Sequence, residues 1–214
     1  MKKNLFIAFE GLDGSGKSTQ VNLLSENMKK AGLKVYTTSE PTDGPIGSVI
    51  RNIMKGRIEA DHRTIAGLFV ADRLDHLLNK SNGILKKLEE GYSVITDRYY
   101  FSSYAYQGTH VPMDWVIEAN SLSAEILRPD INIYIDISPE LSMKRINNGR
   151  SLMELYETTE NLQNVKKKYL EAFDLLKSKE NIFVIDGASS PEEIALEIWK
   201  EVSRLATRTI PSTG

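Results

Sequence analysis

The sequence predicts an α/β fold in which a five-stranded parallel sheet is flanked by helices. Short apolar runs alternate along the chain with longer amphipathic stretches, which is the pattern of a parallel sheet covered on both faces. A glycine-rich segment joins the first apolar run to the first amphipathic stretch. No internal repeat, low-complexity tract or long linker divides the 214 residues, so we expect one domain over residues 1–214.

The expected elements follow from these runs in order. The strands are Leu5–Phe9, Lys34–Thr38, Tyr92–Thr96, Ile131–Ile137 and Ile182–Ile185. Helical patterns cover Ser18–Ala31, Ile46–Lys55 and His62–Glu90, two pieces before residue 131, and one piece on either side of the polar segment Asn147–Ser151. A last helix has a core face of Ala195, Ile198, Trp199, Val202 and Leu205 at helical spacing, and residues 207–214 are expected to fray.

The composition is that of an ordinary globular protein, with 41% hydrophobic and 26% charged residues and a formal net charge of −2. This balance argues against non-specific binding to nucleic acid or to an anionic membrane, which needs surplus positive charge. The absence of cysteine excludes disulfides, a thiol nucleophile and cysteine-based metal sites. The first apolar run is too short for a secretory signal, and no stretch approaches the roughly 20 apolar residues of a membrane helix. We therefore expect a soluble cytoplasmic protein.

The strongest motif is Gly11-x-x-x-x-Gly16-Lys17-Ser18, which lies between an expected strand and an expected helix. This context is that of a P-loop, whose glycines let backbone N–H groups converge on a phosphate beside the positive end of the helix dipole. Lys17 would reach the β- and γ-phosphates, and Ser18 would ligate Mg²⁺. The motif predicts a P-loop NTPase three-layer sandwich, with an ATP site over Gly11, Leu12, Asp13, Gly14, Ser15, Gly16, Lys17, Ser18 and Thr19.

The class of P-loop protein is narrowed by what else the chain carries. A regulatory GTPase should contain an Asn-Lys-x-Asp motif that reads guanine. The nearest string, Asn79-Lys-Ser-Asn82, lacks the aspartate and lies in a helical pattern. A large motor ATPase needs a far longer chain, so a small kinase fits the sequence best.

Three further segments suggest an acceptor site. Phe69 and Arg73 are four residues apart, so both project from one helix face, where a flat apolar plate and a planar bidentate donor suit a nucleobase. Asp97 and Arg98 follow the third strand, at the edge where open α/β sheets bind ligands, and suit Mg²⁺ and a phosphate respectively. The polar segment Lys144–Arg150 has the character of a mobile flap that carries an arginine.

Each of these segments also has a structural interpretation. Phe69 suits an apolar core, and Arg73 suits an exposed surface. The Asp97–Arg98 pair could simply end a strand, and the polar segment could be a plain turn between helices. His76 lies four residues from Asp72 and is interpreted as an ordinary pair on a helix surface.

Taken together, these segments resemble the thymidylate kinase family over nearly the whole chain. The phosphate loop alone is generic, but the complete set of motifs is specific. The set occurs in the family's order and spacing and comprises, besides the phosphate loop, Glu40-Pro41, Phe69 with Asp72-Arg73, Asp97-Arg98-Tyr99, Ser102-Ser103 and Ala105-Tyr106-Gln107-Gly108.

The resemblance implies an acceptor site for dTMP. By this resemblance, Phe69 stacks on thymine and Arg73 donates to its O4 carbonyl. Asp13 holds the 3′-hydroxyl of the acceptor sugar, and Tyr106 crowds the 2′ position of that sugar. The other implied substrate-binding residues are Arg98 and Arg51, which clamp the acceptor phosphate, and Pro41, Ser103, Gln107 and Tyr156.

The resemblance also implies how the donor nucleotide is held. Arg145 packs on adenine, and Asp186 lies in the loop that lines the adenine pocket. Some members carry an arginine within the phosphate loop, where this chain has Gly14. Members without that arginine supply a catalytic arginine from the flap, which spans about residues 147–157 here. Arg150 is therefore the implied catalytic arginine.

The implied reaction is ATP + dTMP → ADP + dTDP, with Mg²⁺ as cofactor and a homodimer as the assembly. The implied catalytic residues are Lys17, Asp97, Arg98 and Arg150, and the metal ligands are Ser18 and Asp97. Because the acceptor phosphate is already an anion, catalysis rests on alignment and charge neutralisation. Two alternatives stay open: a kinase of the same fold for another nucleotide or a deoxynucleoside, and a nucleotide-binding switch without turnover.

Overall fold

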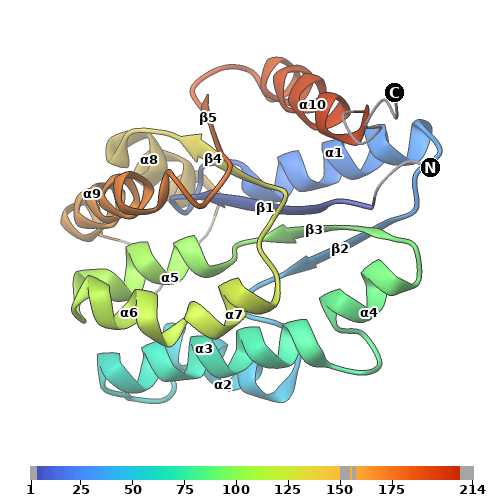
Figure 1. Cartoon of the computed structure of the whole chain (residues 1–214). Helices are drawn as coiled ribbons and strands as arrows, with labels where there is room; N and C mark the ends of the chain where they lie inside the picture. Colours follow the sequence, from blue (N-terminus) through green and yellow to red (C-terminus); the bar gives the residue numbers. More distant parts are fainter. Residues whose placement is uncertain (1–3, 150–154, 156–157, 208–214) are drawn as a thin grey trace.

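Five parallel strands form one sheet in the order β2-β3-β1-β4-β5 (Figure 1). We describe the fold from a computed structural model, of which residues 4–149, 155 and 158–207 are described. The strands are β1 (Phe6–Gly11), β2 (Val35–Ser39), β3 (Ser93–Asp97), β4 (Ile131–Asp136) and β5 (Ile182–Asp186). The predicted α/β class with a five-stranded parallel sheet flanked by helices is confirmed.

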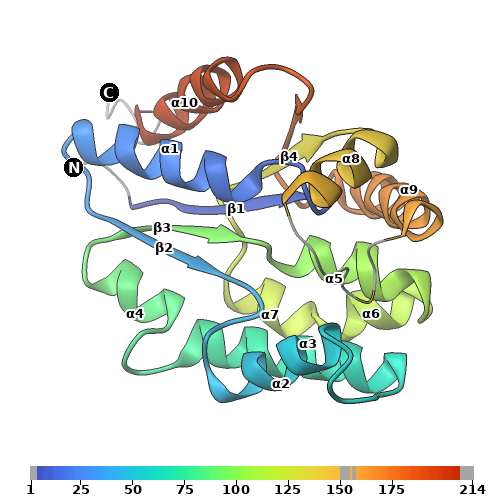
Figure 2. The same ribbon diagram turned by 180° about the vertical axis from the view of Figure 1, so that it is seen from behind.

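Helices cover both faces of this sheet. In the views of Figures 1 and 2, α1 and α10 lie on one face, and α2 to α7 lie on the other. The helices are α1 (Lys17–Lys30), α2 (Pro45–Met54), α3 (His62–Leu78), α4 (Ile84–Glu89), α5 (Tyr100–Tyr106), the 3₁₀ turn η1 (Gln107–Thr109), α6 (Met113–Ala119), α7 (Ser121–Ile126), α8 (Pro139–Gly149), α9 (Thr159–Leu176) and α10 (Pro191–Thr207). None of the helices in the described part of the chain is long and apolar enough to cross a membrane.

The alternation of side chains along β1 divides the core into two halves. Successive side chains of a strand point to opposite faces. Phe6 and Ala8 accordingly pack with residues of α3, α5 and α9, whereas Ile7 and Phe9 pack with residues of α1 and α10. Since β1 is buried on both faces, its first four residues, Phe6–Phe9, form a continuous apolar run, as the strand prediction assumed.

The order of the strands places a crevice at the carboxyl end of β1. After β1 the chain builds β2 and β3 on one side of β1, and it then crosses to build β4 and β5 on the other. Ligands of open α/β sheets bind at such a change of direction, where the loops that follow neighbouring strands diverge. The phosphate loop between β1 and α1 lies at this crevice.

Most predicted elements agree with the structure to within two residues at either end, but the helical run His62–Glu90 is wrong as a single element. It divides into α3 and α4 at Asn79–Gly83. The Asn79 side chain accepts hydrogen bonds from the backbone N–H groups of Ser81 and Asn82, which forms a turn in place of a further helical turn. A Cβ at Gly83 would lie 2.4 Å from the Asn79 carbonyl oxygen, so the turn requires glycine there.

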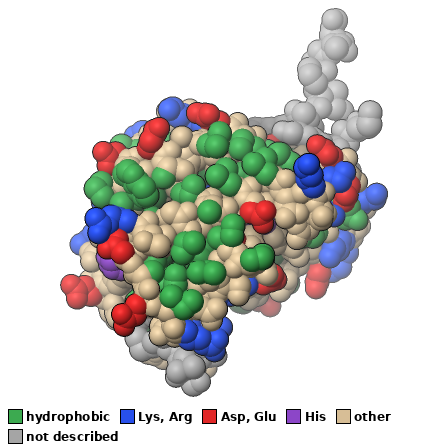
Figure 3. Space-filling view, turned by 90° about the horizontal axis from the view of Figure 1, so that it is seen from below, with side chains coloured by type: hydrophobic (Ala, Val, Ile, Leu, Met, Phe, Trp, Pro, Cys, Tyr) green, Lys and Arg blue, Asp and Glu red, His purple; other side chains and the backbone are tan. Residues whose placement is uncertain are grey.

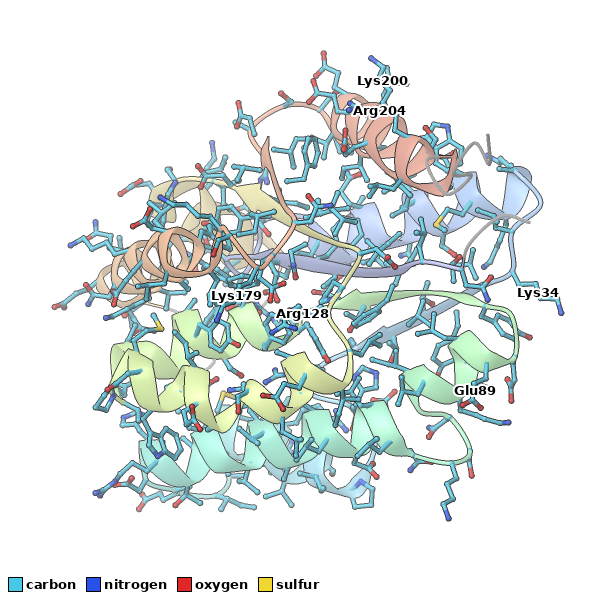
Figure 4. The ribbon with its side chains drawn as sticks, viewed as in Figure 1. Lys34, Glu89, Arg128, Lys179, Lys200 and Arg204 are labelled. Carbon is cyan, nitrogen blue, oxygen red and sulfur yellow. The ribbon has the colours of Figure 1, made fainter. Side chains whose placement is uncertain are left out.

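The face of α10 that was predicted to be core is buried against α1 and the sheet. Ile198 and Val202 are buried, and Trp199 and Leu205 pack beside them. On the outer side of the same helix, Lys200 and Arg204 are exposed and point away from the protein (Figure 4).

Replacement of Ile198 by alanine tests this packing. Ile198 is 1% exposed, so the truncation removes buried apolar contacts and leaves a cavity. We expect the free energy of unfolding to fall by about 2–5 kcal/mol in urea titrations. Leu196 lies on the same helix but is 55% exposed, and Leu196→Ala should change that free energy by less than about 0.5 kcal/mol. Equal losses from the two substitutions would contradict the placement of α10.

Candidate active site

A cleft of about 390 Å³ opens at the carboxyl ends of β1 and β3. It lies between the phosphate loop, the loop that follows β2, the start of α5 and helix α8. Its lining residues are Asp13, Gly14, Gly16, Lys17, Ser18, Thr19, Ser39, Glu40, Asp97, Arg98, Arg145 and Ile146. Predicted nucleotide, metal and acceptor residues therefore meet in one cavity.

The phosphate loop takes its shape from its glycines. Gly11 and Gly14 have φ angles of 144° and 72°, a region that residues with a side chain rarely adopt. A Cβ on Gly11 would lie 2.8 Å from the Ile135 carbonyl oxygen, and one on Gly14 would lie 3.0 Å from that of Ser142. The loop thus leads without obstruction into the N-terminus of α1, whose free N–H groups and dipole favour an anion.

Lys17 places its ammonium group inside this loop. Its Nζ donates to the carbonyl oxygens of Leu12 at 2.8 Å and Gly11 at 3.2 Å, and the residue is only 6% exposed. Burial lowers the pKa of Lys17 to about 8, and the charge of Arg98 acts in the same direction. Lys17 also lines the cleft, which fits its predicted contact with phosphate oxygens.

Ser18 and Asp97 come together from separate elements. The Ser18 hydroxyl, in the first turn of α1, donates to Asp97 Oδ2 at 2.7 Å. The other oxygen, Asp97 Oδ1, is buried and has no hydrogen-bond partner among the described residues. A hydroxyl and a carboxylate are hard oxygen ligands, and Mg²⁺ in phosphotransferases is bound by few side chains together with phosphate oxygens. The two residues therefore fit the predicted magnesium site.

Arg98, Asp13 and Tyr106 form the acceptor side of the cleft. The Arg98 guanidinium donates to Asp13 Oδ1 and, at 3.2 Å, to the Tyr106 hydroxyl, which in turn donates to Asp13 Oδ2 at 2.8 Å. Burial raises the pKa of Asp13, but the positive charges of Arg98 and Lys17 outweigh it and leave that pKa below its usual value. Asp13 is therefore ionised, and its carboxylate oxygens can accept a hydrogen bond from a hydroxyl group.

Arg98 itself has an unusual backbone. Its φ angle is 76°, the only positive φ of a non-glycine residue in the described part of the chain. Such a conformation is strained by about 1–3 kcal/mol and persists where surrounding contacts determine it. The Arg98 N–H donates to the Phe9 carbonyl at 2.9 Å, and the Arg98 carbonyl accepts from the Thr96 hydroxyl at 2.9 Å. Strain of this kind is typical of functional sites.

Arg73 is a buried hub, so its interpretation as a surface cation is wrong. It is 1% exposed, and its Nε and one terminal nitrogen donate to Glu40 Oε2 at 2.9 and 2.6 Å. The other terminal nitrogen donates to the Ser103 hydroxyl at 3.0 Å and to the Asn120 side-chain oxygen. Burial lowers the pKa of Arg73, but Glu40 outweighs this and raises it. The expected contact with thymine O4 stays a prediction.

His76 is not a surface residue, so this interpretation of the sequence is also wrong. It is 6% exposed, and its ring nitrogens lie 3.0 Å from Glu40 Oε1 and 2.7 Å from the Thr38 hydroxyl. Asp72 instead accepts from the backbone N–H and the hydroxyl of Thr42 at 2.8 and 2.6 Å. Helix α3 therefore holds the loop that follows β2 through Asp72, Arg73 and His76.

Three other predicted acceptor residues, Arg51, Phe69 and Gln107, are not among the residues that line the cleft. Arg51, on α2, donates to the carbonyl oxygens of Pro41 and Thr42. Phe69 is half-buried on α3, one helical turn before Arg73. Gln107 is buried, and its Oε1 has no hydrogen-bond partner among the described residues. Their contacts with a substrate stay predictions.

A second cavity adjoins the phosphate loop on the side of α10. It is lined by Gly14, Ser15, Gly16, Thr19, Gln20, Arg145, Gly187, Ser189, Pro191 and Ile194. Arg145 crosses it and donates to the Gly187 carbonyl at 3.0 Å. Asp186 accepts from the Ala188 N–H at 2.9 Å and so shapes the loop after β5. Arg145 thus lines this cavity, and its contact with adenine, like that of Asp186, stays a prediction. Arg150, Tyr156 and most of the flap over residues 147–157 lie outside the described residues.

A family profile described as thymidylate kinase matches residues 9–198. The chain belongs to the thymidylate kinase family. A probable thymidylate kinase of Caldivirga maquilingensis is 42% identical over 78% of this chain and 79% of that protein. One of Pyrobaculum aerophilum is 38% identical over 94% and 97%. The thymidylate kinase of Leptospira borgpetersenii is 33% identical over 92% of each chain. Membership of the thymidylate kinase family makes the chain a phosphotransferase, as the sequence predicted.

Two contributors to the site were missed in the sequence. Glu40 belongs to the Glu40-Pro41 motif, but no neighbouring residue in the sequence indicates that its carboxylate pairs with Arg73. Asn120 lies between α6 and α7, is fully buried and accepts from Arg73. Its partner is 47 residues away, and no periodicity or motif marks the position. Only the tertiary structure identifies either contact.

A further carboxylate, Glu10, lies beneath the phosphate loop on β1. It is fully buried, and burial raises its pKa to about 7 against hydrogen bonds from Ser102, Tyr99 and Tyr169 that lower it. In an unfolded chain its pKa is near 4.5. The folded state therefore binds a proton at Glu10 more tightly than the unfolded state does.

This difference predicts how stability depends on pH. The proton on Glu10 contributes stability that is complete below about pH 4.5 and is lost as the pH rises to about 7. Glu10→Gln removes this titration. As the pH rises from about 4.5 to about 7, the unfolding free energy of the wild type should therefore fall by about 3 kcal/mol relative to that of the variant. Urea unfolding at several pH values measures it, and parallel curves for the two proteins would contradict the raised pKa.

The Glu40–Arg73 pair makes a separate prediction. Glu40→Ala leaves the Arg73 charge buried without its carboxylate, so the free energy of unfolding should fall by about 3–5 kcal/mol. The matched control is Arg63→Ala, which breaks an exposed ion pair with Asp61. That substitution should leave unfolding close to the wild type because solvent screens the pair. A similar small effect of both substitutions would show that Arg73 finds compensation elsewhere.

Proposed function

We propose that this chain is a dTMP kinase, which transfers the γ-phosphate of ATP to dTMP and gives ADP and dTDP. The observation that carries the proposal is that two cationic groups face one cleft. Lys17 belongs to the phosphate loop, and Arg98 lies beside it, anchored on Asp13 and Tyr106. Both groups donate to the Gly11 carbonyl oxygen, at 3.2 and 3.3 Å. A nucleotide-binding switch needs only the first cation, whereas transfer to a monophosphate needs both.

In this proposal the protein aligns two anions and neutralises their charge. Lys17 stays in contact with the phosphoryl group while it is transferred, and Arg98 binds the phosphate of the acceptor. Ser18 and Asp97 would hold Mg²⁺, which when bound neutralises charge on the phosphate oxygens. The Asp13 carboxylate accepts a hydrogen bond from the 3′-hydroxyl of the acceptor sugar. No general base is required, because a phosphate monoester is already an anion near neutral pH.

Recognition of the nucleosides is proposed to follow the family pattern. Phe69 stacks on thymine, and Arg73 binds its O4 edge, while Tyr106 crowds the 2′ position of the sugar. Cytosine carries an amino donor in place of O4, which would face the donors of Arg73. The other proposed contacts are Pro41, Arg51, Ser103, Gln107 and Tyr156 for the acceptor, Arg145 and Asp186 for adenine, and Arg150 for the transition state.

The direct test measures ADP release from MgATP with dTMP, dUMP, UMP, dCMP, AMP, GMP and thymidine as acceptors. We expect the highest kcat/KM with dTMP. In Arg98→Ala, turnover of dTMP should fall by about a hundredfold or more, because a charge contact to the acceptor phosphate is lost. Preference for thymidine or another monophosphate would overturn the acceptor assignment. Binding of ATP without turnover of any acceptor would favour a switch.

The proposal includes a single domain over residues 1–214, a cytoplasmic location and a homodimer formed through helix packing. Figure 3 shows apolar side chains gathered in patches on the face below the sheet of Figure 1. Exposed apolar residues of the helices on this side are Val49, Leu78, Trp115 and Leu122. Apolar surface of this kind favours contact with another protein surface.

Sedimentation equilibrium tests the assembly. We expect twice the 24.1 kDa mass of one chain. Leu78→Glu, on α3, should shift the mass towards that of the monomer, because it puts a charge into an apolar interface. Leu196→Glu is the matched control, since Leu196 is similarly exposed but lies on α10, on the opposite face of the sheet. A monomer in the wild type would overturn the dimer.

A further inference from the structure

Glu10 is hydrogen-bonded to two groups that hold Arg98, one at its backbone and one at its side chain. Glu10 itself is not among the residues that line the cleft. It is the fifth residue of β1, and its side chain is fully buried between the phosphate loop, α5 and α9. A carboxylate in that position requires hydrogen-bond donors. Oε1 accepts from the Tyr99 N–H at 2.9 Å, and Oε2 accepts from the Ser102 hydroxyl at 2.5 Å and the Tyr169 hydroxyl at 3.1 Å.

The first contact acts on the backbone of Arg98. Tyr99 N–H belongs to the peptide that immediately follows Arg98, whose φ of 76° is strained. The hydrogen bond from this N–H to Glu10 fixes the orientation of that peptide. With the bond from the Arg98 N–H to Phe9, β1 holds the residue from both of its peptides.

The second contact acts on the side chain of Arg98. A serine hydroxyl has one hydrogen to donate, and the Ser102 hydroxyl donates it to Glu10 Oε2. Its lone pairs are thereby left for Arg98, whose terminal nitrogen donates to Ser102 Oγ at 3.0 Å. A hydroxyl that pointed its hydrogen at the guanidinium would repel it. The Tyr169 hydroxyl, 2.9 Å from Ser102 Oγ, also donates to Glu10 Oε2, so Glu10 orients the Ser102 hydroxyl both directly and through Tyr169.

We propose that Glu10 is a positioning residue that holds Arg98 in the conformation with which it binds the acceptor phosphate. This inference rests on the proposed function, in which Arg98 is the phosphate clamp. Glu10 reaches Arg98 through two independent routes, the Tyr99 peptide and the Ser102 hydroxyl. It does not act as a base on the substrate, because the carboxylate is fully buried and both of its oxygens accept bonds from the protein.

The test compares steady-state kinetics of Glu10→Gln, Ser102→Ala and the double variant with the wild type at a pH above 7, where the Glu10 carboxyl is ionised. Glutamine keeps the size of the side chain but loses the charge and one acceptor. We expect Glu10→Gln to raise KM for the acceptor monophosphate about tenfold and to leave KM for ATP within about twofold. Ser102→Ala should raise the acceptor KM less, since the backbone route remains. The double variant should raise the acceptor KM by less than the product of the two single increases, because both residues act on Arg98.

Tyr100→Phe is the control for a general loosening of α5. Tyr100 is fully buried, and its hydroxyl donates to Glu180 at 2.7 Å, away from Arg98. This variant should change neither KM. Equal effects of Glu10→Gln on both substrates, or an acceptor KM no higher than in Tyr100→Phe, would overturn the positioning role.

The two proposals fail in different ways. If the wild type prefers a monophosphate other than dTMP, the proposed substrate is wrong, and the KM of the preferred monophosphate becomes the readout because Arg98 contacts phosphate and not base. If the wild type turns over dTMP and the variants keep a normal acceptor KM, only the role of Glu10 is wrong. If no monophosphate is turned over, both are wrong.

Discussion

The parallel pairing of β1 with β3 is the contact on which the rest of the site depends. It sets Phe9 opposite Asp97, the last residue of β3, and β1 continues two residues further to Gly11. The phosphate loop then begins beside Arg98, and the Ser18 hydroxyl reaches Asp97 across the sheet edge. A shift of the register by one residue would turn Asp97 to the opposite face. One strand pair thus brings together the residues proposed to bind phosphate, metal and acceptor.

The charges of the cleft are compensated before any ligand arrives. The chain has a net charge of only −2, so its cations attract phosphate through local placement and not through a general field. Arg98 is paired with Asp13, and Arg73 with Glu40. A buried cation without a partner would be strongly destabilising. These carboxylates therefore stabilise the fold and fix the direction in which each guanidinium points, which lowers the reorganisation needed on binding.

The features that could be predicted from the sequence are those that neighbouring residues determine. The phosphate loop needs a strand, spaced glycines and a helix within a few residues, so its geometry follows from its motif. The strands follow from apolar runs. The spacing of Asp72 and His76 suggested a surface pair because it matches a helix repeat, yet the fold buries His76 against Glu40 from another element. Contacts between distant segments, such as Arg73 with Asn120, leave no local pattern.

The bonds of Arg73 constrain how a base is read. Its three nitrogens already donate to Glu40, Ser103, Asn120 and the Tyr99 carbonyl. A carbonyl on a ligand must therefore share one of these donors. The contacts with Ser103, Asn120 and the Tyr99 carbonyl yield more easily than those with Glu40, because a neutral oxygen accepts more weakly than a carboxylate. Glu40 anchors the guanidinium during this exchange. In the proposed function, Arg73 would therefore select the base from a position that Glu40 fixes, and not as an arginine that is free to follow the ligand.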